Sequence, residues 1–217
     1  MLTGKIPLMI HTVLNYIVSI LSVVLAVVYM LRFSGNSKPY KIFSVYLVFI
    51  ALIQITLWVY ALQKLNNLFL FPYYFIGQFL FVSAFYFSLL RKKWMLPVTL
   101  VVLASLVFQY ICYPETTKDF NAYGVSITQS VVAFYALLYY YRSLVGEARF
   151  LYINAGVLLY FTTSILFFSS SDWITSLNLP DTIENNLDSV NDILYFIFIL
   201  LILVEWFKNY RTKKTHN

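Results

Sequence analysis

Long uninterrupted runs of apolar residues alternate with short polar segments along the whole chain. A membrane-spanning helix needs about 20 mostly apolar residues, and seven runs reach that length. They do not show the alternation of barrel strands. The pattern therefore predicts an all-α polytopic membrane protein with a single seven-helix transmembrane domain over residues 1–217. The expected spans are about 10–31, 42–62, 68–90, 94–113, 123–141, 151–170 and 189–207.

The composition agrees with a lipid environment. Hydrophobic residues make up 61% of the 217 residues and charged residues only 11%, against about 25% charged in soluble domains. The net charge of +6 does not indicate nucleic-acid binding, because the basic residues lie in small clusters between apolar runs and not along one face. With Cys112 as the only cysteine, an intramolecular disulfide is excluded.

The distribution of Lys and Arg predicts the orientation, since cytoplasmic loops carry an excess of these residues. With the N-terminus outside and the C-terminus inside, 12 of the 15 basic residues fall on the cytoplasmic side. These are Arg32, Lys38, Lys41, Arg91, Lys92, Lys93, Arg142, Arg149, Lys208, Arg211, Lys213 and Lys214. We therefore expect a multi-pass protein of the plasma membrane, in bacteria the inner membrane, with the lipid bilayer as its constant partner.

The longest loop carries one local signal for a helix start. Pro180 is followed by Asp181 and, three residues later, by Glu184, the spacing of an N-cap residue and its reciprocal capping partner. The last helix is therefore expected to begin near Thr182, ahead of its apolar span.

Polar side chains inside the spans are unevenly distributed in depth. Such side chains are costly in hydrocarbon unless they face the bundle interior or a wet cavity. In the predicted orientation most of them lie in the outer half of the membrane. They predict an outward-facing polar cavity that admits a small-molecule ligand from outside. The candidate lining residues are Asn15, Gln54, Tyr74, Gln78, Gln109, Gln129, Asn191 and Asp192. The alternative is that each polar side chain simply joins two helices.

Asn154 and Glu205 are the main polar residues in the inner half. Lys208 follows Glu205 by three residues, a spacing that brings side chains together on a helix. Near an interface such a carboxylate can reach toward the headgroups and pair with a cation. We expect a structural anchor at this point, with partner binding as the alternative.

The residues needed for familiar membrane enzymes are missing. The two histidines, His11 and His216, lie on opposite sides of the predicted membrane, whereas zinc hydrolases need several ligands at one metal. A serine nucleophile would have only His11 as its base. No lysine lies inside a span to carry retinal. The sequence therefore predicts a protein that is not an enzyme, with no cofactor, no metal site and no catalytic residue.

The last third of the chain resembles a known group of proteins. The stretch Tyr152–Tyr160, the stretch Ser164–Phe168 and the opening Asn191–Tyr195 of the last span resemble small seven-helix sensor proteins and sensor modules associated with bacterial histidine kinases. The resemblance implies membrane signalling and supplies no catalytic residues. The chain carries no kinase domain, so a signal would have to leave through a membrane-protein partner on the cytoplasmic face.

Three functions fit these observations. The first is a signalling or sensory protein that binds a ligand in its outer cavity and acts through a separate partner. The second is an accessory or scaffold subunit of a larger membrane complex, and the third is a small-solute transporter. A cavity of about 300 Å³ or more, lined by the outer polar residues, would favour the first over the second.

Overall fold

The computed structural model describes residues 5–114, 121–146, 149–169 and 181–211. Within these ranges it is all-helical and has seven helices that are long and apolar enough to cross a membrane. Their bounds are α1 Lys5–Met30, α2 Lys38–Leu62, α3 Leu70–Leu90, α4 Met95–Cys112, α5 Ala122–Ser143, α6 Leu151–Ser169 and α8 Asp181–Asn209. The predicted all-helical class is confirmed in these ranges, and the seven helices have the length and composition of a multi-pass membrane protein.

The helix boundaries differ from the predicted spans mainly at three N-termini. Helix α1 begins at Lys5, and α2 begins at Lys38, where Pro39 occupies the first turn. Proline is tolerated there because the first turn has no intrahelical acceptor for its missing N–H. Helix α8 begins at Asp181, which confirms the helix start expected near Thr182.

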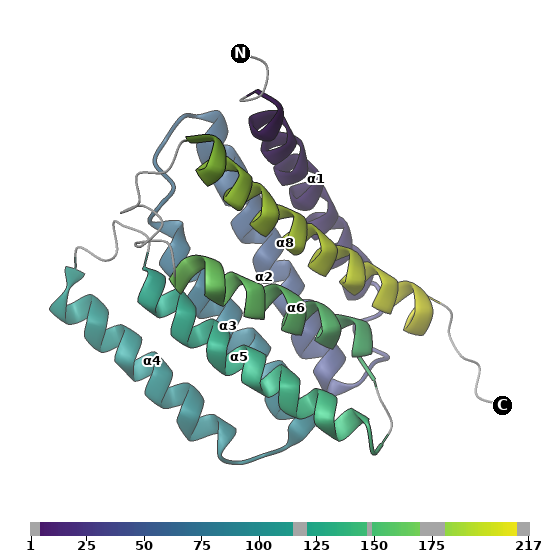
Figure 1. The fold of residues 1–217 in the computed structure, drawn as a ribbon. Coiled ribbons are helices and arrows are strands. Elements are labelled where there is room, and N and C mark those ends of the chain that lie inside the picture. Colours follow the sequence, from purple (N-terminus) through teal and green to yellow (C-terminus); the bar gives the residue numbers. More distant parts are fainter. Residues whose placement is uncertain (1–4, 115–120, 147–148, 170–180, 212–217) are drawn as a thin grey trace.

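Six of the helices form a closed ring. Neighbouring helices in contact are α1 with α2, α2 with α3, α3 with α5, α5 with α6, α6 with α8, and α8 with α1. Helix α4 packs only lightly on α3 and α5 and lies at the margin of the bundle (Figure 1). The core of the protein is therefore the axis of a six-helix ring, and α4 is an addition to its outside.

Helix α4 buries few of its side chains. Of its residues only Met95, Val102 and Leu106 are buried, whereas large apolar side chains such as Val101 and Ile111 are 68% and 74% exposed. A helix that is apolar on most faces but buries only one narrow stripe fits a lipid environment. The peripheral position of α4 could not be predicted from the sequence, because all seven spans are similarly apolar.

Glycines allow two close contacts in the ring. A Cβ atom added at Gly77 would lie 2.2 Å from the Phe49 ring of α2, and one added at Gly156 would lie 2.7 Å from the Phe198 ring of α8. Both distances are too short for real atoms, so these rings occupy the space that a side chain would fill. Small residues bring helices together in this way in membranes.

The two ends of the ring differ in charge and packing. We call one end the basic end, because Arg32, Arg91, Arg142 and Lys208 lie at or next to the helix termini there. The opposite end, where α1 and α8 begin and α2 ends, is called the cavity end for the reason given below.

Aromatic side chains fill the ring toward the basic end. Tyr29 stacks on Tyr40 with a centroid distance of 5.2 Å, and Phe85 meets Phe150 edge to face at 5.4 Å. Offset-stacked and edge-to-face pairs stabilise packing beyond simple burial. We call this cluster, which joins five helices or their ends, the aromatic plug: Tyr29, Tyr40, Phe43, Phe85, Phe150 and Tyr210.

Hydroxyl groups of the aromatic plug are bonded to the backbone. Tyr29 donates to the Ile202 carbonyl at 3.0 Å and Tyr40 to the Tyr29 carbonyl at 3.0 Å. Burial, with a further contribution from the Glu205 carboxylate, raises the pKa of the Tyr210 hydroxyl, which lies just beyond the last span. The plug is thus a packed region whose polar atoms are largely paired.

Glu205 does not pair with Lys208 as the spacing suggested. Its side chain is fully buried, and its carboxylate accepts a hydrogen bond from the Tyr152 backbone N–H at 3.0 Å and another from the Asn209 amide at 2.7 Å. Lys208 instead donates to the Tyr152 hydroxyl. The reason is that the first N–H groups of α6 lack intrahelical acceptors, and a carboxylate is favoured at that positive end. Glu205 therefore caps α6 from α8.

Candidate functional site

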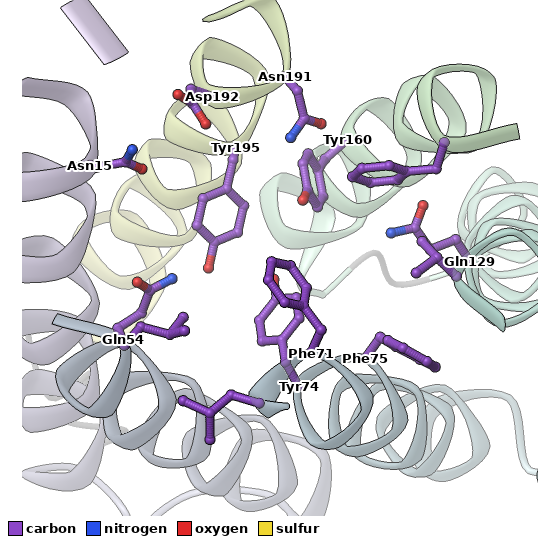
Figure 2. A pocket seen from close by; sticks show the side chains of 14 residues that line it. Asn15, Gln54, Phe71, Tyr74, Phe75, Gln129, Tyr160, Asn191, Asp192 and Tyr195 are labelled. Carbon is purple, nitrogen blue, oxygen red and sulfur yellow. The ribbon is translucent and has the colours of Figure 1, made fainter. Parts of the chain in front are cut away.

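A cavity of about 330 Å³ lies on the axis of the ring at the cavity end. All six ring helices contribute to its wall, and α4 contributes nothing. Figure 2 shows polar and aromatic side chains pointing into it from several sides. The lining residues are Asn15, Gln54, Leu57, Leu70, Phe71, Tyr74, Phe75, Val125, Gln129, Tyr160, Phe168, Asn191, Asp192 and Tyr195. We call it the axial cavity.

Six of the eight residues proposed from the sequence are brought together here. They come from five different helices and are Asn15, Gln54, Tyr74, Gln129, Asn191 and Asp192. Each of these residues lies in the same half of its span, and a closed ring brings such positions together around one axis.

Gln78 lies below the axial cavity and does not line it. Its side chain is 2% exposed, and its amide N–H groups donate to the Tyr46 hydroxyl at 3.1 Å and to the Tyr74 hydroxyl at 3.3 Å. Since Tyr46 packs against Phe43 at 5.4 Å, Gln78 connects the cavity wall above it with the aromatic plug below it.

Gln109 does not line the axial cavity, contrary to the prediction. It lies on α4, outside the ring, and exchanges hydrogen bonds with the Asn121 side chain at 3.0 and 3.2 Å. Asn121 in turn caps α5 by accepting from the Gly124 N–H at 2.8 Å. The position of Gln109 along its helix agrees with the prediction, but this position does not determine whether the helix belongs to the ring. Its role is to join α4 to the start of α5.

Apart from Tyr74, the aromatic residues of the cavity wall were not predicted from the sequence. Tyr160 and Tyr195 face the cavity with ring centroids 5.1 Å apart, and Phe71, Phe75 and Phe168 complete the aromatic lining. In a chain that is 20% aromatic, nothing in the sequence distinguishes these five rings from packed core residues. Only their position around the axis does.

Among the described residues, two polar atoms of the wall are buried without a hydrogen-bond partner. These are the Gln129 side-chain oxygen and the Tyr195 hydroxyl. Gln129 is only 4% exposed, and the Tyr195 hydroxyl points toward Gln54 and Tyr74 (Figure 2) without a bond of normal geometry to either. Since buried polar groups are nearly always satisfied, these atoms favour a hydrogen-bonding occupant.

Other polar groups of the wall are held by neighbours. Ser164 donates to the Asn191 side-chain oxygen at 3.2 Å, and Ser19 donates to the Gln54 side-chain oxygen at 3.5 Å. These contacts connect α6 with α8 and α1 with α2. The axial cavity therefore has a wall that is partly fixed before any ligand enters.

A second hollow lies at the basic end. It has a volume of about 850 Å³ and is lined by five cations and no carboxylate among the described residues. The cations are Lys38, Arg91, Lys93, Arg142 and Arg149. Arg142 is fixed by donating to the Leu89 and Leu90 carbonyls at 3.0 and 3.1 Å, at the negative end of α3. We call this hollow the basic groove.

The axial cavity combines a few polar groups with a mainly apolar wall, a combination typical of ligand pockets. Amide, hydroxyl and carboxylate groups converge there, and such groups can orient a small molecule in a mainly apolar pocket. Within the described ranges no three His, Cys, Asp or Glu side chains come together, so we name no metal ligands there.

The chain was compared with known proteins in three ways. No family model matches it, and neither the curated proteins nor the solved structures contain a match.

Proposed function

We propose that this protein is a non-enzymatic signalling or sensory protein of the plasma membrane, in a bacterial cell the inner membrane. It binds a small molecule in the axial cavity, which opens to the outside, and passes the change to a separate membrane-protein partner at the cytoplasmic face. The observation that supports this most is the 330 Å³ cavity on the ring axis, with a buried and unpaired acceptor at Gln129 in its wall.

A ligand in the axial cavity would contact helices on all sides of the ring. Because six helices share the wall, a molecule that contacts opposite sides changes the distance between helices that do not touch each other. Packed helices respond to such changes by small shifts of about 1–2 Å. Ligand binding would thus alter the ring itself and not one isolated loop.

A continuous set of contacts leads from the axial cavity to the basic end. Tyr74 in the wall is bonded to Gln78, Gln78 is bonded to Tyr46, and Tyr46 packs on Phe43 of the aromatic plug. Contact alone does not demonstrate coupling. It does provide a path along which a shift of α3 would reach the ends of α2 and α3 beside the basic groove.

The basic groove supplies a surface for the partner. Its five cations come from the start of α2, the region between α3 and α4, the last turn of α5, and the region between α5 and α6. Shifts of these helices would change the spacing of the cations. Since charge complementarity governs which partners associate, an acidic segment of a cytoplasmic or membrane protein is the expected contact.

A second function, an accessory or scaffold subunit, is favoured by a different observation. Residues of α2, α3 and α4 and of the segment after α2 line an apolar hollow of about 960 Å³. Phe49, Leu80 and Tyr110 are among its lining residues. A helix of another chain in this hollow would give the protein a role without a ligand.

Purification from native membranes tests the proposed function. Val125 is buried in the cavity wall, so Val125→Phe fills the axial cavity. The matched control is Val101→Phe on the exposed face of α4. We expect mass spectrometry to find one small molecule with the wild type and with Val101→Phe, and not with Val125→Phe. Equal recovery from all three, or a co-purified protein subunit with no small molecule, would contradict the ligand-binding function.

The proposed partner is tested separately by proximity labelling from the C-terminus. Arg142→Gln and Arg149→Gln together remove two cations from the basic groove, and Lys64→Gln removes one at the other end of the molecule. A specific partner is expected with the wild type and Lys64→Gln but not with the double variant. Recovery of only bulk membrane proteins in every case would count against a signalling partner.

A further inference from the structure

Two polar side chains of the axial cavity wall are almost fully buried, and each carries an atom without a hydrogen-bond partner. Gln129 on α5 is 4% exposed and Tyr195 on α8 is 9% exposed. The Gln129 side-chain oxygen and the Tyr195 hydroxyl have no partner among the described residues. They belong to different helices and project toward the cavity from different sides (Figure 2). Since an unsatisfied buried polar atom costs free energy, both atoms favour an occupant that supplies the missing bonds.

The Gln129 amide calls for a group that donates and accepts at neighbouring atoms. Its oxygen only accepts and its nitrogen only donates, and Figure 2 shows the amide directed toward the space bordered by Tyr160 and Phe71. Rotating the amide by half a turn exchanges the two atoms, so either setting leaves the same complementary pair to be supplied. A carboxamide or a lactam carries such a pair, an N–H beside a C=O, in one plane.

Water is a less suitable partner for this amide. A buried water molecule makes about three hydrogen bonds to polar groups of the protein. Near Gln129 the wall is apolar, because Val125 lies one turn earlier on α5 and lines the same cavity, and Figure 2 shows Phe75 close to Gln129. A molecule with apolar surface of its own would also remove these side chains from water, which is favourable.

The aromatic part of the wall favours a flat apolar body. The Tyr160 ring is nearly parallel to the Phe198 ring at a centroid distance of 5.7 Å, and the Tyr195 ring lies 5.1 Å from it. Contacts between aromatic rings stabilise packing beyond simple burial. A planar ligand can therefore extend this group of rings while its polar edge meets Gln129.

From the unpaired amide, its apolar surroundings and the rings, we infer that the axial cavity binds a small flat carboxamide or lactam. The ligand N–H donates to the Gln129 oxygen, the ligand carbonyl accepts from the Gln129 nitrogen, and the ligand ring packs on Tyr160. The volume of about 330 Å³ is at the lower end of the range for ligand pockets, which limits the molecule to a small one. This inference rests on the proposed ligand-binding function.

Two compounds of the same shape test the inference on the purified full chain. In acetophenone a methyl group replaces the NH2 group of benzamide, so acetophenone keeps the ring and the carbonyl but has no donor. Since a site built to bond an N–H rejects an analogue that lacks it, we expect benzamide to bind at least about tenfold more tightly than acetophenone. Saturation-transfer NMR measures both affinities, and the rise in melting temperature should follow the same order.

Variants assign this preference to Gln129. Gln129→Leu removes both polar atoms of the amide and should weaken benzamide binding by at least about tenfold, with acetophenone binding unchanged. Gln109→Leu makes the same substitution outside the ring and should keep the preference of the wild type. Tyr160→Leu removes a ring that both compounds contact and should weaken both by about threefold. Val125→Phe should abolish the binding of both.

The outcomes separate this inference from the function on which it rests. If acetophenone binds as tightly as benzamide and Val125→Phe abolishes both, the cavity is a ligand site but the amide assignment is wrong. A preference for benzamide that persists in Gln129→Leu also overturns the assignment. If neither compound binds, the molecule that co-purifies from native membranes decides: a carboxamide or lactam supports the inference, and any other molecule overturns it alone. If nothing co-purifies either, the proposed function fails with it.

Discussion

The two ends of the same six-helix ring use aromatic residues in opposite ways. At the basic end, rings such as Phe85 and Phe150 pack against each other with no exposure above 1%. At the cavity end, Tyr160 and Tyr195 are equally close to each other, but they border a space of 330 Å³. Aromatic content alone therefore does not decide whether a helix bundle is solid or hollow.

Polar groups show the same contrast. Glu205 near the basic end has a hydrogen-bond donor for each carboxylate oxygen, whereas Gln129 at the cavity end has a buried oxygen with none. A satisfied buried group stabilises a single arrangement, and an unsatisfied one is a cost that binding can remove. The basic end is therefore packed with its buried carboxylate satisfied, and the cavity end keeps a buried acceptor without a partner among the described residues.

Cysteine labelling gives the largest expected contrast between the two ends. In a Cys112→Ser background, a cysteine at position 37 should resist a membrane-impermeant maleimide in intact cells, and one at position 185 should react. Position 37 precedes α2 at the basic end, and position 185 lies in the first turns of α8. Permeabilised cells provide the control for reactivity. Labelling at position 37 in intact cells would reverse the proposed orientation.

Removing an aromatic ring should be far more costly in the plug than at the cavity wall. We expect Phe85→Ala to lower the free energy of unfolding by about 4 kcal/mol, because the ring is fully buried among others and its loss leaves a void. Phe71→Ala, at the edge of an existing space, should cost about half as much. Thermal unfolding in detergent measures both, and equal losses would show that the two ends are packed alike.

Glu205→Ala should destabilise the basic end by about 3 kcal/mol. The substitution leaves the Tyr152 N–H at the start of α6 without its acceptor. Glu205→Gln retains an acceptor and serves as the control, with a smaller loss. Hydrogen exchange at the first turn of α6 provides a local measurement. An alanine variant as stable as the wild type would mean that the cap contributes nothing.

The two glutamines give the smallest and most specific contrast. Gln109→Leu should lower stability by about 0.6 kcal/mol, a typical value for a hydrogen bond between membrane helices, because it breaks the contact with Asn121. It should leave ligand binding intact. Gln129→Leu should not lower stability, since its oxygen has no partner to lose, but it should abolish ligand binding. Thermal unfolding and ligand binding are measured on both variants. Loss of ligand binding in Gln109→Leu, with loss of stability alone in Gln129→Leu, would contradict the roles assigned to the two residues.

The positions of the helices could be predicted closely from the sequence. Each span ended within a few residues of the observed helix, and the start of α8 followed from the spacing of Asp181 and Glu184. Such features are local, because hydrophobic runs and capping residues act on the nearest few turns. The candidate site was predicted only in part, since Gln109 and Gln78 shared the depth of the lining residues but not their position around the axis.

The sequence by itself determined that the chain forms seven helices long and apolar enough to cross a membrane, where each helix lies, and that polar side chains gather toward one end. These properties depend on what each segment exposes to lipid or water. Which helices close the ring, that α4 stays outside it, that Glu205 caps another helix, and that Tyr160 and Tyr195 face a cavity were decided only by tertiary structure. Each depends on contacts between residues distant in the chain. The sequence of a helix that is apolar on nearly all faces does not show which other helix it packs against.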